Sequence, residues 1–207
     1  MTADLKPHER RQQRTRQAIL DAARQIISQK GIDGLSLRGI ARAIDYSPAG
    51  LYEYFGSKEE IVHAVADEGH LRLRHAMAAV PETDDFVADM AGLGHAYLRF
   101  AAENPDHFLL MFTILPQYAC AEDGMSEMMG EKSAFPILLQ AAERGVREGV
   151  FATREEHGPL EIAFTAWFDI HGVAMLRLTQ LNCLPSDVLD RLTDLSMRNM
   201  MRGLMAE

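Results

Sequence analysis

The stretch YSPAGLYEYFGSKEE, residues 46–60 of this 207-residue chain, places several hydrogen-bonding groups close together. Ser47, Tyr52 and Tyr54 supply hydroxyls that can donate and accept hydrogen bonds, and Lys58 supplies a cation. Hydroxyls and cations are the groups that proteins commonly direct at the phosphate oxygens of DNA. The residue types therefore indicate binding of a phosphate backbone.

The distribution of charge supports this interpretation. Residues 1–58 contain ten Lys and Arg against six Asp and Glu, whereas residues 59–207 contain eleven against twenty-four, and the formal net charge of the chain is −9. A basic segment joined to an acidic one suggests that the first segment meets a polyanion, which the second repels.

The chain shows no pattern typical of catalysis. Asp169 and His171 are two residues apart, so on a helix they point in different directions, and the eight histidines are scattered. We find no nucleophile–base pair, phosphate loop or metal-ligand spacing. The sequence predicts that the protein is not an enzyme and uses no metal or cofactor.

Composition indicates a helical, globular protein, with 47 % hydrophobic and 25 % charged residues. No apolar run approaches the roughly 20 residues that span a bilayer, and no secretory signal is evident. Cys120 and Cys183 lie far apart and are expected to be free thiols rather than a redox pair. We expect a cytoplasmic protein without a membrane partner.

Helix signals divide residues 1–56 into three helices. An apolar stripe predicts a first helix over 7–30, preceded or begun by a basic arm and ended by Gly31. Ser36 is a predicted N-cap for a short second helix, and Asp45 stands at the turn that follows. Ser47 followed by Pro48 predicts the start of a third helix, through about residue 54.

This order of helix, tight turn and short helix is that of a helix-turn-helix unit, whose second short helix enters the major groove of DNA. Ser57 with Glu60 then forms a capping-box pattern. Beyond it, the periodicity predicts further helices over 57–80, 85–103, 104–116, 125–148, 159–181 and 186–205, and no strand.

The motif GLSLRGIARAIDYSPAGLYEYFGSKEEI resembles the TetR family of transcriptional regulators. In addition, NPDHFLLMF and AWFDIHGVAMLRL look like a subgroup with a Trp-x-x-x-His-Gly signature, here Trp167, His171 and Gly172. The resemblance implies an all-α fold, with a helix-turn-helix DNA-binding domain over residues 1–56 and a larger helical ligand-binding and dimerisation domain over 57–207.

Three positions depart from the family's common pattern. Asp45 and Ala49 stand where many members have glycine, and Gly50 where many have a small polar residue. Pro48, Ala49 and Gly50 leave only apolar contact or close backbone approach for base readout, although Glu53 could accept from a cytosine amino group.

Pattern and resemblance together predict three sets of functional residues. Arg38 is either a solvated charge or a phosphate clamp, and Ser36 and Ser47 are caps that can also bind phosphate. The predicted DNA contacts are Arg14, Ser36, Arg38, Ser47, Pro48, Ala49, Gly50, Tyr52, Tyr54 and Lys58.

A mainly apolar cavity with a few polar groups is expected in the second domain. The alternative is a packed core, which we prefer for Phe168. The predicted ligand contacts are His95, Phe108, Met111, Phe112, Phe135, Trp167, His171 and Met175.

Apolar stripes on the last two helices are explained either by packing within one chain or, as the resemblance implies, by pairing with a second copy. The predicted dimer contacts are Ile162, Phe164, Leu189, Leu192 and Met200.

These expectations describe a homodimeric repressor that binds a palindromic double-stranded operator and is released by an unknown small-molecule effector. Two alternatives remain open: a ligand-insensitive DNA-binding protein, and a helical small-molecule-binding protein with a vestigial DNA-binding domain.

Overall fold

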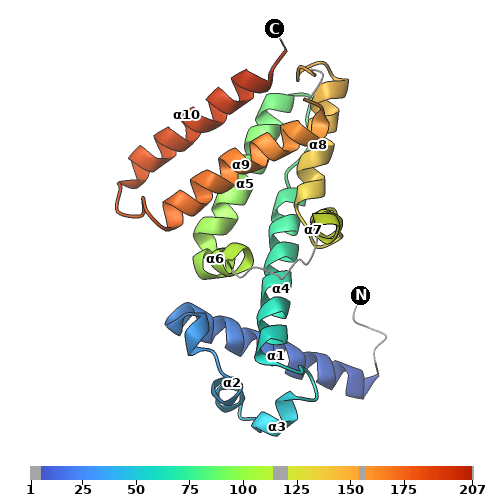
Figure 1. Cartoon of the computed structure of the whole chain (residues 1–207), viewed down its shortest axis with the longest axis vertical. Helices are drawn as coiled ribbons and strands as arrows, with labels where there is room; N and C mark the ends of the chain where they lie inside the picture. Colours follow the sequence, from blue (N-terminus) through green and yellow to red (C-terminus); the bar gives the residue numbers. More distant parts are fainter. Residues whose placement is uncertain (1–5, 114–120, 154–156, 207) are drawn as a thin grey trace. The chain divides into compact units, whose positions relative to one another are not determined.

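The computed structural model describes residues 6–113, 121–153 and 157–206, and helices joined by turns and loops make up most of these ranges (Figure 1). The chain divides into two compact units, Met1–Gly69 and His70–Glu207, which we call the head and the body. The division falls inside one long helix, α4 (Lys58–Ala78), so the head contains the first turns of that helix. None of the helices in the described ranges is long and apolar enough to cross a membrane.

The head is built from α1 (Pro7–Lys30), the 3-10 turn η1 (Ile32–Gly34), α2 (Leu37–Ala43), α3 (Pro48–Leu51) and the start of α4. Helix α1 packs against α2 and η1, and α2 packs against α3. The apolar stripe of α1 is buried as its spacing predicts: Ile19 and Ala23 are fully covered. The buried residues of the other elements include Ile40, Leu51 and Phe55.

Local signals set the ends of these helices as predicted. The Ser36 side chain accepts a hydrogen bond from the Gly39 N–H, and the Ser47 side chain accepts one from the Gly50 N–H. Asp45 takes the left-handed backbone conformation, with φ of 52°, which aspartate tolerates better than most residues and which reverses the chain between α2 and α3. The helix-turn-helix expectation is therefore confirmed.

The basic residues Arg10, Arg11, Arg14 and Arg16 lie in the first turns of α1, where the sequence placed them. One detail of the head differs from expectation. Ser57 caps α4 by accepting from the Glu60 N–H, but the Glu60 carboxylate accepts from the N–H of Gly56 and not of Ser57. The carboxylate therefore joins α4 to the residue before its cap.

The body contains the rest of α4, α5 (Phe86–Glu103), α6 (Pro105–Thr113), α7 (Ala121–Met128), α8 (Phe135–Arg147), α9 (Pro159–Leu178) and α10 (Ser186–Leu204). Helix α9 packs against α5, α8 and α10 (Figure 1). Its central place explains why its sequence is apolar on several sides. The core around it includes Phe100, Phe108, Ala142, Ile162 and Leu204.

The prediction of one helix over 125–148 is wrong. The structure has two helices, α7 and α8, with an interruption between them where the Ser133 N–H donates to the Gly130 carbonyl. Ser133 also caps the start of the next segment through the Phe135 N–H, and Pro136 occupies a first-turn position of α8. Glycine, a serine cap and a first-turn proline are the usual signals for an end followed by a new start. The predicted end of the helix at residue 116 lies outside the described residues.

The end of α10 is tied to the segment after α8 by a short antiparallel bridge between Phe151 and Met205. The Ala152 N–H donates to the Leu204 carbonyl, and the Ala206 N–H donates to the Val150 carbonyl. This pair of bonds is not a strand, and the described residues form no sheet beyond it.

Candidate DNA-binding and ligand-binding sites

The N-terminal turn of α3 is exposed and carries little hydrogen-bonding capacity of its own. Pro48 and Ala49 are exposed, and Gly50 is half-buried. The Ser47 oxygen accepts from the Gly50 N–H at 3.0 Å, so the hydroxyl retains its proton for an outside acceptor. The Ser36 oxygen accepts in the same way at the start of α2, at 3.1 Å. Both serines can therefore cap a helix and donate to a phosphate at once.

The predicted cationic contacts lie on three elements of the head. Arg14 of α1 and Arg38 of α2 are exposed. Lys58 is half-buried, and its Nζ donates to the Ile32 carbonyl at 3.2 Å. An ammonium has three donors, so this bond leaves Lys58 able to bind a phosphate as well. The lysine thus joins the start of α4 to η1, a role that the sequence did not indicate.

Three tyrosines lie in the helix-turn-helix segment, Tyr46 in its turn and Tyr52 and Tyr54 at its end. Tyr46 was not among the predicted DNA contacts. Tyr52 is 59 % exposed, whereas Tyr54 is half-buried and packs edge-on against Tyr46, with ring centroids 6.2 Å apart. A hydrogen bond to the Tyr54 side chain, then burial, raises the pKa of Tyr46 above its ordinary value. Tyr46 had a visible signal, an aromatic residue directly before a cap, but the spacing suggested nothing for it.

An aromatic cluster in the body is formed by side chains of α5, α6, α8 and α9. Its members are Tyr97, Phe108, Phe112, Phe135, Phe164, Trp167 and His171. Phe108 is fully buried, and its ring contacts those of Tyr97, Phe112 and His171. Trp167 contacts both His171 and Phe135, and Phe164 contacts Phe135 and Trp167. The predicted Phe108, Phe112, Phe135, Trp167 and His171 are thus brought together, and Met111 and Met175 lie in the same core.

Two polar groups meet inside this cluster. The Tyr97 hydroxyl lies 2.8 Å from Nδ1 of His171, a residue 74 positions away in the sequence. Burial lowers the pKa of His171 below 6.5, so its imidazole is neutral at pH 7. Burial also raises the pKa of Tyr97, and a hydrogen bond from the Trp167 side chain partly offsets that effect. Indole, phenol and imidazole thus form a neutral polar chain among the aromatic rings.

One predicted ligand contact, His95, lies elsewhere. The His95 side chain is 53 % exposed and faces Asp194 of α10 at 3.8 Å, so it is not part of the aromatic cluster. Asp169 accepts from Ser196 Oγ at 2.6 Å and also belongs to the α9–α10 packing. Among the described residues, no three His, Cys, Asp or Glu side chains are placed to hold a metal ion.

Phe168 contradicts its predicted place in the core, because it is 66 % exposed on α9. Its ring contacts the rings of Phe164 and Trp167, but most of the side chain is exposed to solvent. The spacing did not reveal this, because nearly every face of α9 carries an apolar residue.

The predicted dimer contacts divide into exposed and buried ones. Leu192 is 46 % exposed, and Phe164 and Met200 are half-buried. Leu189 is only 8 % exposed, and Ile162 is completely covered by its own chain, so the structure places Ile162 in the core and not on a surface that a partner could reach. Cys183 is a free, exposed thiol, and Cys120 lies outside the described residues.

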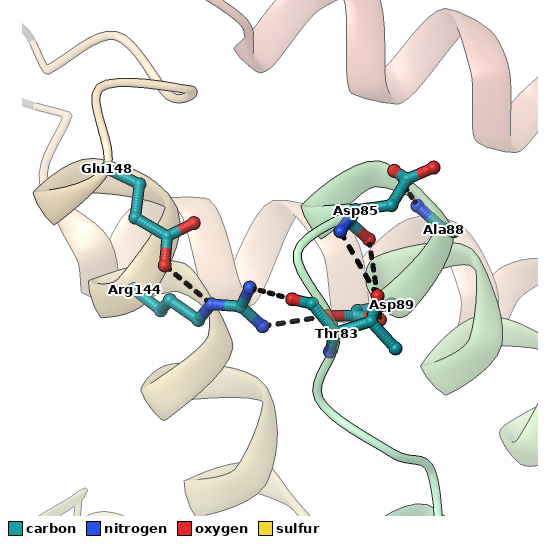
Figure 2. A network of polar contacts seen from close by, with 6 residues as sticks. All are labelled: Thr83, Asp85, Ala88, Asp89, Arg144 and Glu148. Carbon is teal, nitrogen blue, oxygen red and sulfur yellow. Dashed lines mark hydrogen bonds and ion pairs between the residues drawn. The ribbon is translucent and has the colours of Figure 1, made fainter.

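A second polar site in the body joins the α4–α5 connection to α8 (Figure 2). The Arg144 guanidinium binds the Asp89 carboxylate at 2.7 Å, the Glu148 carboxylate at 2.7 Å and the Thr83 carbonyl. Asp89 also accepts from the backbone N–H and the hydroxyl of Thr83, and these bonds, with those of Arg144, lower its pKa. Residues so far apart in the sequence gave no sign of this network.

Models of known protein families match two segments of the chain. Residues 19–65 match the model described as bacterial regulatory proteins, tetR family, and residues 90–200 match the model of a tetracyclin repressor-like C-terminal domain. A nicotine-responsive transcriptional repressor, HdnoR of Paenarthrobacter nicotinovorans, is 31 % identical over 150 residues, which cover 62 % of this chain and 70 % of that protein.

Other relatives match mainly by a shorter segment. An uncharacterized regulator, YobS of Bacillus subtilis, is 32 % identical over 45 % of this chain and 49 % of its own length. For UidR of Escherichia coli the identity is also 32 %, over 40 % of this chain and 44 % of the relative. The matched region thus spans about half the length of these two relatives.

Solved structures share the fold. A Rhodococcus sp. RHA1 protein of unknown function superposes with a TM-score of 0.75 at 24 % identity, over 92 % of this chain and 95 % of that one. PfmR, a TetR family transcriptional regulator from Thermus thermophilus, gives a TM-score of 0.63 at 24 % identity, over 87 % and 97 %.

Proposed function

Because the chain belongs to the TetR family of bacterial regulatory proteins, and so is a DNA-binding transcriptional regulator, we propose that it acts as a homodimeric repressor that a small molecule releases from its operator. The observation that carries the proposal is the helix-turn-helix of the head, in which two serine-capped helices flank a turn at Asp45 and leave the start of α3 exposed. Helices of this kind read DNA in the major groove.

The proposed DNA surface combines the start of α3 with cations from α1, α2 and α4. Tyr52 and Tyr54 supply phenol groups at the end of the motif, while Arg38 and Lys58 supply charge. Ser36 and Ser47 donate their hydroxyl protons, and Arg14 adds a further cation from α1. Pro48, Ala49 and Gly50 form the part of the surface that faces the base edges.

The DNA half of the proposal is tested by binding of the purified protein to DNA from upstream of its own gene and to a scrambled duplex, over a salt series. Arg38→Ala should weaken binding to every sequence and reduce the slope of log K against log salt by about 0.9, the contribution of one phosphate. Arg99→Ala removes an exposed arginine of α5 in the body and is the matched control. Equal binding of both duplexes by the wild-type protein would contradict sequence-specific recognition.

We place the ligand at the aromatic cluster around Tyr97 and His171. Its rings offer apolar contact, and its neutral hydroxyl and imidazole offer hydrogen bonds to an uncharged or aromatic nitrogen compound. The name of the HdnoR relative, nicotine-responsive, supports a nitrogen heterocycle as the first compound class to test. The Trp-x-x-x-His-Gly signature supplies two of the cluster's members, Trp167 and His171.

Induction requires that the ligand binds better to a conformation with low operator affinity. Nicotine and related heterocycles should raise the melting temperature of the wild-type protein and weaken its operator binding, and His171→Leu should abolish both effects. His95→Leu, outside the cluster, is the control. A compound that binds at this cluster and leaves operator affinity unchanged would remove induction from the proposal.

Dimerisation is proposed through α9 and α10. Each helix exposes large apolar residues at helical spacing, Phe168 and Leu176 on α9 and Leu192 and Leu195 on α10. Phe164 and Met200 lie beside them as half-buried neighbours. A two-fold dimer built on this surface would present two heads to a roughly palindromic operator.

Sedimentation equilibrium tests the dimer. Leu192→Glu, which places a charge on the exposed stripe of α10, should yield monomers and weaken operator binding. Val87→Glu, at a comparably exposed apolar position of α5, should leave the mass unchanged. A monomeric wild-type protein at micromolar concentration would contradict this part of the proposal.

A further inference from the structure

Tyr46 occupies a fixed position between α2 and α3. Its backbone N–H donates to the Ala41 carbonyl at 2.8 Å, and it follows Asp45, whose left-handed conformation turns the chain. The next residue, Ser47, caps α3. Both neighbours of Tyr46 are therefore held by local bonds, and its side chain is directed by the turn itself.

The Tyr46 ring fills the space in which residue 50 would otherwise carry a side chain. A Cβ placed on Gly50 would lie 2.5 Å from Cε1 and 3.0 Å from Cδ1 of Tyr46. Gly50 has no positive φ, so its backbone conformation does not require glycine. The aromatic ring is the closest obstacle, with the Ser47 oxygen next at 3.1 Å, and any larger residue at position 50 must displace Tyr46.

The exposed part of the ring lies among groups suited to DNA. Tyr46 is 39 % exposed, packs edge-on against Tyr54 and shares a hydrogen bond with its hydroxyl. Two hydroxyls that share one hydrogen bond keep one O–H donor for an outside acceptor. Arg11 of α1 and Glu53 are the charged groups near enough to act on the Tyr46 phenol, and Arg11 favours a neighbouring phosphate.

We propose that Tyr46 determines the sequence specificity of DNA binding, because its ring takes the place of the side chain absent at Gly50 on the base-reading surface of α3. The ring edge is suited to the C5-methyl group of thymine, the apolar group of the major groove. The edge-on contact with the Tyr54 ring holds the Tyr46 ring in place. This inference rests on the proposed DNA-binding function of the head.

A purely structural role for Tyr46 makes a different prediction. If the ring only supported α3, its loss would weaken binding to all sequences alike. If it contacts a base, its loss relaxes the preference at one position of each half-site. The readout that separates the two roles is therefore base preference, measured at equal protein folding.

The experiment selects DNA from a randomised duplex library with the full-length protein and its variants. Tyr46→Ala should lower the preference at one half-site position by about fivefold or more, the lower range of what one mismatched base pair costs. Tyr46→Phe keeps the ring and should keep that preference. Gly50→Ala displaces the ring and should reproduce the Tyr46→Ala pattern.

The double variant Gly50→Ala with Tyr46→Ala should be no worse than Tyr46→Ala alone, because residues in contact are not additive. Thermal denaturation verifies folding of each variant, and Tyr46→Leu replaces Tyr46→Ala if the latter is unfolded. Uniformly weaker binding with unchanged base preference would overturn the inference while leaving the proposed function intact. A wild-type protein that enriches no sequence would instead overturn the proposed function, and the inference with it.

Discussion

Polar contacts stabilise the helix-turn-helix segment of the head and, separately, the helical body. The contacts of the segment join residues close together in the sequence, whereas those of the body join residues far apart. In the segment from Ser36 to Glu60, three serine caps each join residues three positions apart. In the body, hydrogen bonds join residues separated by 55 to 74 positions, from Arg144 to Asp89 and from Tyr97 to His171. Local caps position a surface, whereas long-range bonds position a core.

This difference has a consequence for function. A surface that local signals specify keeps its geometry with few tertiary partners, which suits a DNA-reading element. A site assembled from α5, α6, α8 and α9 depends on how these helices pack, so small shifts between them alter it. The proposed effector site therefore lies where the packing of several helices can respond to a ligand.

The largest expected effect is the loss of a core ring in the body. Phe108→Ala should lower the free energy of unfolding by about 3–5 kcal/mol, because it leaves a cavity among Tyr97, Phe112 and His171. Urea denaturation measures it. Val87→Ala, at an exposed site of α5, should stay within about 0.5 kcal/mol. A loss no larger than that of a cap variant would show that the body does not depend on its long-range packing more than the helix-turn-helix segment depends on its caps.

The next effect concerns the Asp89 network, and it depends on pH. The Thr83 N–H and hydroxyl and the Arg144 guanidinium lower the pKa of Asp89 below 3.8, so the carboxylate stabilises the folded state above the ordinary aspartate pKa. That stability is lost as the pH falls through the lowered pKa. Asp89→Asn should therefore reduce the melting temperature at pH 7 and match the wild-type protein more closely near pH 3.

Asp187→Asn is the control for that measurement, since Asp187 is exposed in the first turn of α10. We expect the Asp89 effect to lie between that of the core cavity and that of a helix cap. If the difference in melting temperature between the wild-type protein and Asp89→Asn grew as the pH fell, the pKa of Asp89 would not be lowered in the folded state.

A smaller loss is expected for a cap of the reading element. Ser47→Ala removes the acceptor for the Gly50 N–H and should cost about 1 kcal/mol of unfolding free energy. It should also weaken operator binding, since Ser47 caps the start of α3. Ser47→Asp restores a capping group and should recover the stability but not the binding, because a carboxylate repels phosphate. Recovery of both would show that the cap alone matters.

The smallest effect tests whether the head also depends on distant contacts. The Arg16 guanidinium lies 4.6 Å from the centre of the Phe55 ring, a cation–π contact between α1 and the end of the helix-turn-helix segment. Arg16→Gln should cost about 0.5 kcal/mol at this exposed position. Arg10→Gln on the same helix is the control, measured by the same denaturation. A loss of unfolding free energy larger than that of Ser47→Ala would show that the head, like the body, depends strongly on contacts between residues far apart in the sequence.

Most of the helices were predictable because their ends carry local signals. Ser36, Ser47 and Asp45 act on backbone groups within a few residues, so their types alone indicate what they do. The break between α7 and α8 was missed although Gly130 and Pro136 mark it, because an apolar period continued across it. Phe168 and Ile162 were misplaced because α9 is apolar on most of its faces, and periodicity cannot tell which face a neighbour covers.

The helix-turn-helix, its caps and turn, and the candidate groups for phosphate could be predicted from the residues alone, since each rests on chemistry between near neighbours. The folded chain was needed to show that Tyr97 meets His171, that His95 faces Asp194, and that the Tyr46 ring occupies the space beside Gly50. These contacts could not be predicted because a side chain's partner depends on the position of its backbone, which the packing of several helices sets.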